Sequence, residues 1–331
     1  MHKIKIAGSD DEFICMPDDT ILRAALRAGH AMPYSCNVGS CGNCRFELAE
    51  GTVHHAREDS PAWGERDLKR NRWLGCQARP ETDCVIKFRS DAKYQPPFAP
   101  SRQSAKLVSK QSITHDIAEF TFTLAAPAGF RPGQYALVEI DGIDGGRAYS
   151  MSNLGGTDQW QFQIKKVPGG AVTSHLFDAI EIGDTITLDG PYGSAYLQEN
   201  SPRNLLLIAG GSGLSPMVSI IRGAAVAGLL DGRQVNFFYG GRNQDDIPAG
   251  ALIDEITGLG TNVDVQIVLS EDASGTYQGG FVHDAAWAKI GDAISDYDLY
   301  FAGPAVMAAA IQKRAYETGL AQDQMFFDEF Y

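Results

Sequence analysis

The chain lacks long hydrophobic runs and any excess of basic residues. No apolar segment reaches the roughly 18–20 residues that a membrane-spanning helix needs, so we expect no contact with a membrane. The 28 Lys and Arg residues are outnumbered by 41 Asp and Glu, which gives a formal net charge of −13. Because nucleic acids are bound through clustered basic side chains, this balance excludes a nucleic-acid partner. The N-terminal residues contain no apolar signal core, so the sequence predicts a cytoplasmic protein, which we expect to be a monomer.

Cysteine is absent after residue 84, and the charge and the pattern of apolar residues also change along the chain, which divides it into segments. Residues 1–92 contain all six cysteines and are nearly neutral, with 13 basic and 14 acidic residues. Residues 93–101 are rich in proline and are predicted to form a linker. Residues 102–201 alternate apolar and polar positions between Gly and Pro turns, which is typical of an antiparallel sheet or barrel. Residues 202–331 carry 7 basic and 16 acidic residues and alternate buried strands with helices, which predicts a doubly wound α/β domain.

Four of the cysteines follow the spacing of a metal centre. Cys36, Cys41 and Cys44 form a C-x4-C-x2-C run, and Cys76 stands further along the chain. Four thiolates suit zinc or an iron–sulfur cluster, but structural zinc sites usually contain two C-x2-C pairs and this chain has one. The run has the plant-type [2Fe–2S] spacing, and no pair of His residues accompanies it, which excludes a Rieske centre. Zinc and a disulfide knot remain as alternatives.

The two other cysteines and the residues around the run complete this prediction. Cys15 and Cys84 lie in apolar, strand-like segments and are interpreted as buried thiols. The segment YSCNVGSCGNCRFELAEG, followed by RWLGCQ, resembles the plant-type ferredoxin domains at the N-terminus of bacterial oxygenase reductases. This resemblance covers residues 1 to 90 and implies an α+β domain of the β-grasp type that holds a [2Fe–2S] cluster. A basic run precedes the last ligand and is either a solvated helix face or a docking surface: Arg66, Lys69, Arg70 and Arg72.

A second group of candidate residues lies on a predicted strand and the turn after it. Arg147, Tyr149 and Ser150 offer a cation, an aromatic surface and a hydroxyl donor, which are the groups that a flavin needs. Gly169 and Gly170 lead into a helix whose N-terminus suits a phosphate, or they form a simple hairpin turn. The order of these segments resembles the flavin domain of the ferredoxin–NADP reductase superfamily. That resemblance implies FAD rather than FMN, a role for Tyr149 in catalysis and a hydrogen bond from Ser150 near flavin N5. The other flavin-binding residues it implies are Met151, Ser152, Gly170, Val172 and Thr173, together with Arg147.

Glycine-rich turns after predicted strands mark a pyridine-nucleotide site. The first turn resembles the G-G-x-G-x-x-P motif of the same superfamily and contains Gly210, Gly211, Ser212, Gly213 and Pro216. The second contains Tyr239, Gly240 and Arg242, and the third contains Gly303 and Pro304. Because Arg242 is the only Lys or Arg among residues 239–246, and a 2′-phosphate attracts several cations, we predict NADH rather than NADPH. The superfamily usually has Cys before the third turn, where this chain has Ala302, so no thiol acts there. The resemblance also implies that Phe330 or Tyr331 covers the flavin.

The three modules occur in the order ferredoxin, flavin barrel and nucleotide domain. This order resembles the NADH-dependent reductase components of bacterial aromatic-ring oxygenase systems, such as those of carbazole dioxygenase and toluene monooxygenase. It implies that electrons pass from NADH through FAD and the [2Fe–2S] cluster to a terminal oxygenase component or an intermediary ferredoxin. Two other functions remain open: an iron–sulfur flavoenzyme that reduces a small molecule such as a deoxysugar intermediate, and a non-enzymatic electron carrier or zinc-stabilised binding module.

Overall fold

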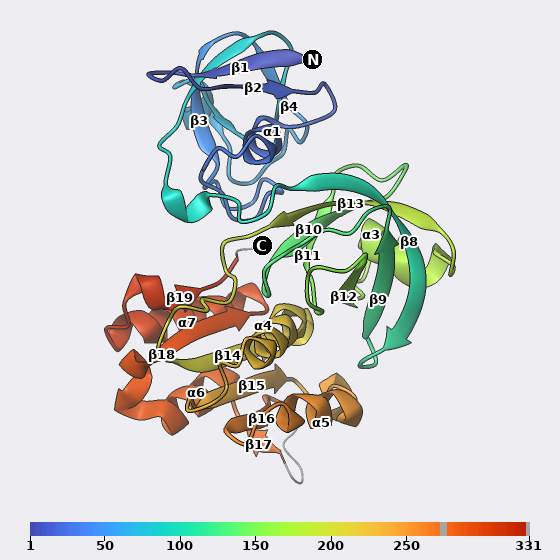
Figure 1. Cartoon of the computed structure of the whole chain (residues 1–331), viewed down its shortest axis with the longest axis vertical. Helices are drawn as coiled ribbons and strands as arrows, with labels where there is room; N and C mark the ends of the chain where they lie inside the picture. The colour runs from blue at the N-terminus through green and yellow to red at the C-terminus, as the bar shows by residue number, and fades with distance from the viewer. Residues whose placement is uncertain (272–276, 329–331) are drawn as a thin grey trace.

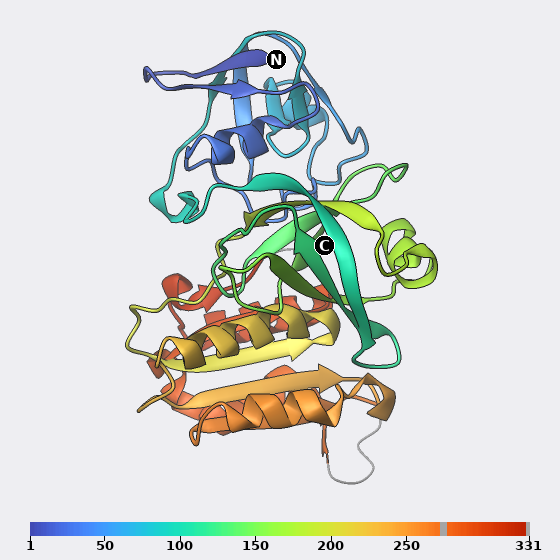
Figure 2. The same ribbon diagram turned by 45° about the vertical axis from the view of Figure 1, so that its right-hand side comes forward.

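The computed structural model describes residues 1–271 and 277–328, which form three units in succession along the longest axis (Figure 1). The N-terminal unit lies at one end, an antiparallel unit lies in the middle, and a parallel α/β unit lies at the other end. The same succession is visible after the molecule is turned (Figure 2). The middle unit therefore has a neighbour on each side.

The N-terminal unit is a small mixed sheet packed against one helix. The main sheet has five strands in the order β2-β1-β7-β3-β5, with β1 and β7 parallel and the other pairs antiparallel, and β4 and β6 form a separate antiparallel pair. Ile21, Leu22 and Leu26 of helix α1 are fully buried in the core that this sheet forms. Helix α1 ends before Gly29, whose φ of 82° is the left-handed conformation that glycine adopts readily. The elements are β1 (His2–Ile6), β2 (Glu12–Cys15), α1 (Ile21–Arg27), β3 (Arg45–Glu50), β4 (Val53–His55), α2 (Glu65–Leu68), β5 (Arg72–Leu74), β6 (Ala78–Pro80) and β7 (Cys84–Lys87).

The middle unit is a six-stranded antiparallel sheet that closes into a barrel. Its order is β11-β10-β13-β8-β9-β12, and a bridge between Met151 and Phe162 joins the two edges. Alternate residues of these strands point inward, so Phe120, Phe122 and Trp160 form a fully buried aromatic core. After a short 3₁₀ turn, η1 (Ala92–Tyr94), the elements are β8 (Ser101–Ser112), β9 (Ile117–Leu124), β10 (Tyr135–Glu139), β11 (Arg147–Ser150), β12 (Gln159–Lys165), α3 (Ala171–Ser174), the π-helical turn η2 (His175–Ala179) and β13 (Thr185–Tyr192).

The C-terminal unit is a parallel sheet with helices on both faces. Its order is β17-β16-β15-β14-β18-β19, and every described pair of strands is parallel. Helices α4 and α5 share one hydrophobic core with the sheet, and α6 and α7 share the other. The predicted three-part fold is thus confirmed. The elements are β14 (Asn204–Gly210), η3 (Gly211–Gly213), α4 (Leu214–Val226), β15 (Val235–Gly241), η4 (Gln244–Asp246), α5 (Gly250–Gly258), β16 (Val263–Leu269), β17 (Gln278–Gly279), α6 (Val282–Ile290), η5 (Gly291–Asp296), β18 (Tyr297–Ala302), α7 (Ala305–Glu317), η6 (Gln322–Gln324) and β19 (Met325–Phe326).

The N-terminal unit is joined to the barrel by buried polar contacts. Arg27 of α1 donates from Nη2 to both carboxylate oxygens of Asp189 on β13, each at 2.7 Å. The hydroxyl of Tyr34 accepts a hydrogen bond of 2.9 Å from the backbone N–H of Gly193. Asp189 is 1% exposed, so its charge depends on Arg27 and on the hydroxyl of Tyr192, which donates to Asp189 Oδ1 at 2.9 Å. Across residues 1–271 and 277–328, no helix is both long enough and apolar enough to cross a membrane.

Candidate functional site

The loop that carries the cysteine run lies between α1 and β3. Cys36, Cys44 and Cys76 are buried, and Cys41 is half-buried. The loop turns through left-handed residues, and Gly39 and Gly42 have φ values of 88° and 80°. Residues with a side chain rarely adopt these angles, which explains the glycines at these two positions. The spacing read from the sequence thus corresponds to a tightly turned loop that brings its thiols inward.

Backbone N–H groups of this loop point at the sulfur atoms. Cys36 Sγ accepts from the N–H groups of Ser40 and Cys41 at 3.3 and 3.4 Å. Cys44 Sγ accepts from the N–H of Cys76 at 3.5 Å. Donors arranged in this way stabilise negative charge on sulfur, as thiolate ligands of a cluster require. The donor set therefore fits a [2Fe–2S] cluster.

The thiols of the chain differ in how easily they ionise. All six cysteines are free, so none is held in a disulfide. The pKa of Cys36 is lowered to about 5, first because the Cys41 side chain donates to it and then because backbone N–H groups do. The pKa values of Cys41 and Cys44 are raised, first because each thiol is hydrogen-bonded to a neighbouring cysteine, and burial raises the pKa of Cys15 to about 12 and also raises that of Cys84. The two cysteines outside the run are therefore protonated thiols in their strands.

Strand β11 carries the residues predicted to bind flavin. Arg147 is exposed, and its Nη1 donates to the carbonyl of Gly145 at 3.0 Å. Tyr149 is half-buried against the barrel core, and burial raises its pKa to about 12. Ser150 pairs with Tyr135 of β10 in the antiparallel register, so the two side chains share a face of the sheet. That face is turned toward the N-terminal unit, because Tyr135 belongs to the core of that unit.

The next two predicted residues point into the protein. Met151 and Ser152 are both 0% exposed. Met151 forms part of the barrel core, and the hydroxyl of Ser152 donates to Glu119 Oε2 at 3.3 Å. Met151 thus supports the end of β11 from within the barrel, whereas Ser152 ties this segment to β9 through Glu119.

The turn predicted to bind a phosphate precedes the short helix α3. Gly170 is half-buried, whereas Val172 and Thr173 are buried. The hydroxyl of Thr173 is used inside the turn, where it donates toward the carbonyl of Gly170 at 3.1 Å and accepts from the N–H of Val167 at 3.2 Å. The side chains of Val172 and Thr173 therefore shape this turn rather than face solvent.

A cavity of about 970 Å³ lies between the cysteine loop and β11. Val38, Ser40 and Cys76 line it from the N-terminal unit, and Arg147 and Tyr149 line it from the barrel. The residues predicted for the cluster and for the flavin are thus brought to one cavity, although they lie more than 70 positions apart in the sequence. An arginine, an aromatic ring and space beside a β-strand fit the diphosphate and ring of a flavin nucleotide.

Helix α4 of the C-terminal unit docks on the end of the same strand. The hydroxyl of Ser215 donates to the carbonyl of Ser150 at 2.6 Å, and that of Ser219 donates to the carbonyl of Asn153 at 2.7 Å. Arg222 also donates to the carbonyl of Ser152 at 3.0 Å. Sequence reasoning did not identify these three residues of α4. Their partners lie 65 to 70 positions away, so no local motif marks them.

The glycine-rich turns of the C-terminal unit lie together at the carboxyl edge of the parallel sheet. A Cβ on Gly213 would lie 2.0 Å from the carbonyl oxygen of Ala302, so only glycine fits where these two turns meet. A Cβ on Gly210 would lie 3.2 Å from Pro304, and one on Gly303 would lie 3.2 Å from Gly210. The turns carry Gly211, Ser212 and Pro216 beside these residues. In parallel α/β sheets this edge is where ligands bind.

The second turn follows β15, next to the first. Gly240 is paired with Gly210 in the parallel sheet. Tyr239 is fully buried, and its hydroxyl donates a hydrogen bond to the carbonyl of Asp246. Arg242 is held by Asp246, which accepts from its Nε at 3.1 Å and from its backbone N–H at 2.8 Å. Burial alone would raise the pKa of Asp246, but these hydrogen bonds hold it below its usual value. The cation of this turn is therefore already engaged with a carboxylate.

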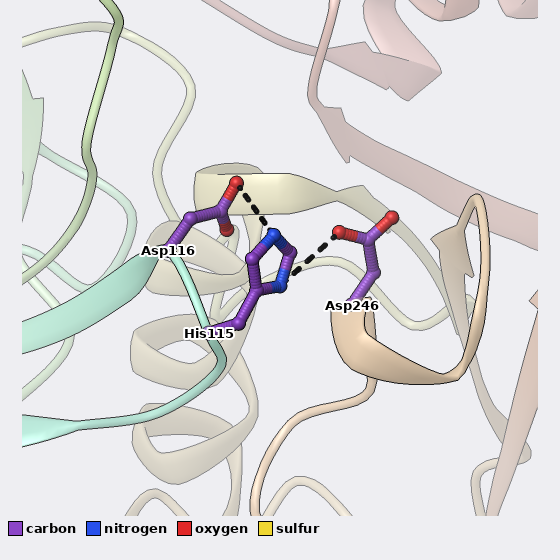
Figure 3. A group of neighbouring side chains, drawn as sticks. All are labelled: His115, Asp116 and Asp246. Atoms are coloured by element: carbon purple, nitrogen blue, oxygen red, sulfur yellow. Dashed lines mark ion pairs between the residues drawn. The ribbon is translucent and has the colours of Figure 1, made fainter.

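His115, which sequence reasoning left without a role, lies where the barrel meets this turn (Figure 3). Its Nε2 is 3.5 Å from Asp116 Oδ2 and its Nδ1 is 3.8 Å from Asp246 Oδ1. The two carboxylates already have cationic partners, since Lys165 contacts Asp116 at 2.9 Å and Arg242 contacts Asp246. The group therefore links the barrel to the C-terminal unit, with His115 Nδ1 2.9 Å from the carbonyl oxygen of Asp245, and both of its carboxylates are already engaged by cations.

The aromatic residues predicted to cover the flavin, Phe330 and Tyr331, lie outside the described residues. The last described residue, Asp328, lies beside Gly193, which directly follows β13, because a Cβ on Gly193 would lie 2.7 Å from Asp328 Oδ2. The same Cβ would lie 3.0 Å from Tyr135. The C-terminal segment therefore approaches the face of the barrel that carries Tyr135.

Fold and site together define an oxidoreductase with iron–sulfur, flavin and nicotinamide modules. Family models match each module: the 2Fe-2S iron-sulfur cluster binding domain over residues 4–81, the oxidoreductase FAD-binding domain over 104–196 and the oxidoreductase NAD-binding domain over 207–313. The predicted cofactors, FAD, a [2Fe–2S] cluster and a nicotinamide nucleotide, are thereby confirmed.

Similar proteins extend over the whole chain. Ferredoxin–NAD(P)+ reductase CarAd of Metapseudomonas resinovorans is 34% identical over 100% of both chains. The ferredoxin–NAD+ reductase component of the alkene monooxygenase system of Xanthobacter autotrophicus is 36% identical over 96% of this chain and 97% of its own length. The solved structure of the ferredoxin reductase in carbazole 1,9a-dioxygenase superimposes with a TM-score of 0.91 at 32% identity, covering 100% of this chain and 98% of that one. The chain belongs to the family of FAD- and [2Fe–2S]-containing reductase components of oxygenase systems.

Proposed function

We propose that the chain carries electrons from NADH, through FAD and a [2Fe–2S] cluster, to a terminal oxygenase component, either directly or through an intermediary ferredoxin. One observation carries this proposal. Strand β11 lies between the two other redox modules, because Ser215 of α4 binds the carbonyl of Ser150 while Tyr135, the cross-strand neighbour of Ser150, contacts Ser35 beside Cys36. The order of the modules in space thus matches the order of electron transfer. The six free cysteines support a reducing, cytoplasmic location.

In this proposal the cluster is held by four thiolates, from Cys36, Cys41, Cys44 and Cys76. The backbone N–H groups that point at Cys36 and Cys44 stabilise the negative charge that the ligands share. Cys41 is the most exposed of the four, so the cluster would come closest to solvent at this ligand. A partner that receives electrons would approach on that side.

FAD would be bound along β11 and the turn before α3. The Arg147 guanidinium would pair with the diphosphate, the Tyr149 ring would pack against the flavin ring, and the Ser150 hydroxyl would donate near N5. Gly170 would offer its backbone to the diphosphate. The buried residues Met151, Ser152, Val172 and Thr173 would hold these segments in shape.

NADH would be bound at the carboxyl edge of the parallel sheet. The first turn, Gly210–Gly213, together with the start of α4 at Pro216, would accept the diphosphate, because glycine allows the backbone to come close and the helix N-terminus attracts negative charge. The second turn, with Gly240 and Arg242, would lie beside the adenosine ribose. The third, with Gly303 and Pro304, would lie beside the nicotinamide. The bound cofactors supply the conversion of a two-electron hydride donor into single electrons.

The surface beside the cluster supports a protein acceptor with carboxylates. Arg66, Lys69 and Arg70 are exposed on and after α2, and the Lys69 side chain is 78% exposed. A hollow of about 470 Å³ lies on the sheet next to them, and four of its seven lining residues are basic. The lining residues are Arg45, Phe46, Glu47, Arg72, Lys87, Phe88 and Arg89. Since Arg45 directly follows the ligand Cys44, this basic surface begins beside the proposed cluster.

Anaerobic titration with NADH, followed by visible absorbance, tests the proposed function. We expect the flavin bands and the cluster bands both to be bleached by NADH. A colourless protein would instead support a zinc-stabilised module, and a cluster that stays oxidised in excess NADH would contradict the electron route. An acceptor assay with an oxygenase component then separates this function from direct reduction of a small molecule.

A further inference from the structure

Arg23 of α1 is a buried arginine attached to the cysteine loop. It is 8% exposed, and its Nε donates to Asn37 Oδ1 at 3.3 Å while Nη2 donates to the carbonyl of Asn37 at 3.4 Å. Asn37 directly follows Cys36, is 1% exposed and has a φ of 56°, which is unusual for a residue with a side chain. Arg23 thus holds the backbone next to a proposed ligand in an uncommon conformation.

The charge of Arg23 is retained despite its burial. Desolvation lowers the pKa of Arg23, but Asp189, Tyr192 and Glu139 raise it above its ordinary value. The nearest carboxylate is that of Glu139 on β10, with Oε1 at 3.6 Å from Arg23 Nη1. The guanidinium is therefore a cation between the cysteine loop and the barrel.

The carboxylates of Asp189 and Glu139, which interact with Arg23, lie closer to two other arginines. Arg27 contacts Asp189 at 2.7 Å, and Arg102 contacts Glu139 at 2.8 Å. Each of these distances is shorter than the 3.6 Å between Arg23 and Glu139. Arg23 thus contacts its carboxylate partner at the long distance of 3.6 Å, and the field of its positive charge also acts on the other groups around it.

The proposed cysteine ligands of the cluster are among these groups. Arg23 lines the same cavity as Cys76 and Gln77, and the Cys76 thiol is close enough to interact with it electrostatically. A cluster held by four thiolates gains one more negative charge when it is reduced. In a buried site of low dielectric, a fixed cation stabilises that reduced form, and the potential of such clusters depends on nearby charge and hydrogen bonds.

We propose that Arg23 is a positioning residue that raises the reduction potential of the [2Fe–2S] cluster, by fixing Asn37 beside Cys36 and by holding a buried positive charge near Cys76. The inference rests on the proposed function in one respect, that the four thiolates hold the cluster. A higher cluster potential makes transfer of one electron from reduced flavin to oxidised cluster more favourable. Arg23 itself is neither oxidised nor reduced.

The test is the midpoint potential of the cluster, measured by redox titration with EPR detection on the full-length holoprotein. Arg23→Met should shift this potential to a lower value. Arg102→Met is the matched control, because Arg102 lines the same cavity and contacts the same Glu139, yet has no contact with the cysteine loop. It should give a distinctly smaller shift. Arg23→Lys, which keeps the charge, should restore most of the wild-type potential.

A cluster potential in Arg23→Met equal to that of the wild type, or a shift no larger than in Arg102→Met, would overturn the inference. If Arg23→Met does not fold, Arg23→Gln keeps a donor for the Asn37 side chain but loses the charge and the Nη2 bond to the Asn37 carbonyl, and the same lower potential is expected. Failure of the proposed function gives a different result: the wild-type protein would then show no EPR signal of a reduced [2Fe–2S] cluster at all.

Discussion

The hydroxyl of Tyr135 donates a hydrogen bond to the carbonyl of Ser35, the residue before the proposed ligand Cys36. Tyr135 is fully buried on β10 and is paired across the sheet with Ser150. A single side chain therefore connects the strand pair proposed to bind flavin with the loop proposed to bind the cluster. The contact joins positions 100 residues apart.

We predict that Tyr135→Phe slows electron transfer from reduced flavin to the cluster several-fold, because it removes this hydrogen bond and keeps the ring. Reduction of the flavin by NADH should be unchanged. Stopped-flow absorbance after mixing with NADH resolves the two steps. Tyr192→Phe is the control, since its hydroxyl bonds Asp189 within the barrel and does not reach the cysteine loop. Equal cluster-reduction rates in the wild type and Tyr135→Phe would disprove the role of this contact.

The pairing of Arg242 with Asp246 predicts coenzyme preference. The wild-type protein should use NADH in preference to NADPH, because the one basic side chain of this turn is already bound to a carboxylate. Asp246→Asn removes that carboxylate, so it should raise kcat/KM for NADPH relative to NADH. Asp245→Asn changes a neighbouring exposed carboxylate and should have a smaller effect. A wild-type protein that used both nucleotides equally well would show that the turn has been misinterpreted.

The basic surface near the cluster predicts a salt-dependent interaction with the acceptor. Replacing both Lys69 and Arg70 by Glu should slow electron delivery to the oxygenase component at low ionic strength, because steering between opposite charges is lost. The difference from wild type should shrink as salt is added. Reduction of ferricyanide by NADH needs only the flavin and should be unaffected. If the double variant delivers electrons to the oxygenase component at the wild-type rate at low salt, these residues form only a solvated helix face.

The buried side chain of His55 predicts that the stability of the N-terminal unit depends on pH. It is buried beside Trp63, its Nε2 accepts from the N–H of Leu74 at 3.1 Å, and burial lowers its pKa to about 4. The unfolded chain therefore binds more protons than the folded one between that value and the ordinary His pKa of about 6.5, so stability falls as the pH is lowered through this window. Between pH 7 and pH 5 the expected loss is about 1–2 kcal/mol.

Urea unfolding followed by the visible circular dichroism of the cluster measures this effect at the two pH values. His55→Gln keeps an acceptor for Leu74 and does not titrate, so its unfolding midpoint should change less with pH than that of the wild type. The same pH dependence in both proteins would assign it to other groups.

The local motifs could be read from the sequence, whereas the contacts between units could not. The spacing of Cys36, Cys41 and Cys44 encodes a loop geometry that depends on neighbouring residues, and Gly213 marks a close approach that no other residue permits. Ser215, by contrast, donates a hydrogen bond to the backbone carbonyl of Ser150. Every residue has such a carbonyl, so the sequence does not mark this partner. The same applies to Arg23, whose bond to Asn37 depends on how α1 packs.

The structure also shows different burial for residues that the sequence pattern places on one face of a strand. Arg147, Tyr149 and Met151 alternate along one segment, yet Arg147 is exposed and Met151 is completely buried. The bridge from Met151 to Phe162 explains this, because closure of the barrel covers the end of the strand. Strand periodicity predicts which residues share a face, but not where along the strand that face meets another element.

The most direct test of the account is EPR spectroscopy of the protein frozen after anaerobic reduction by NADH, compared between the wild type and Cys41→Ser. The wild type should show the signal of a reduced [2Fe–2S] cluster. Cys41→Ser should lose it, while flavin reduction by NADH and turnover with ferricyanide persist. Cys84→Ser, at a buried thiol outside the loop, should retain the signal. An intact cluster signal in Cys41→Ser, or none in the NADH-reduced wild type, would contradict the account.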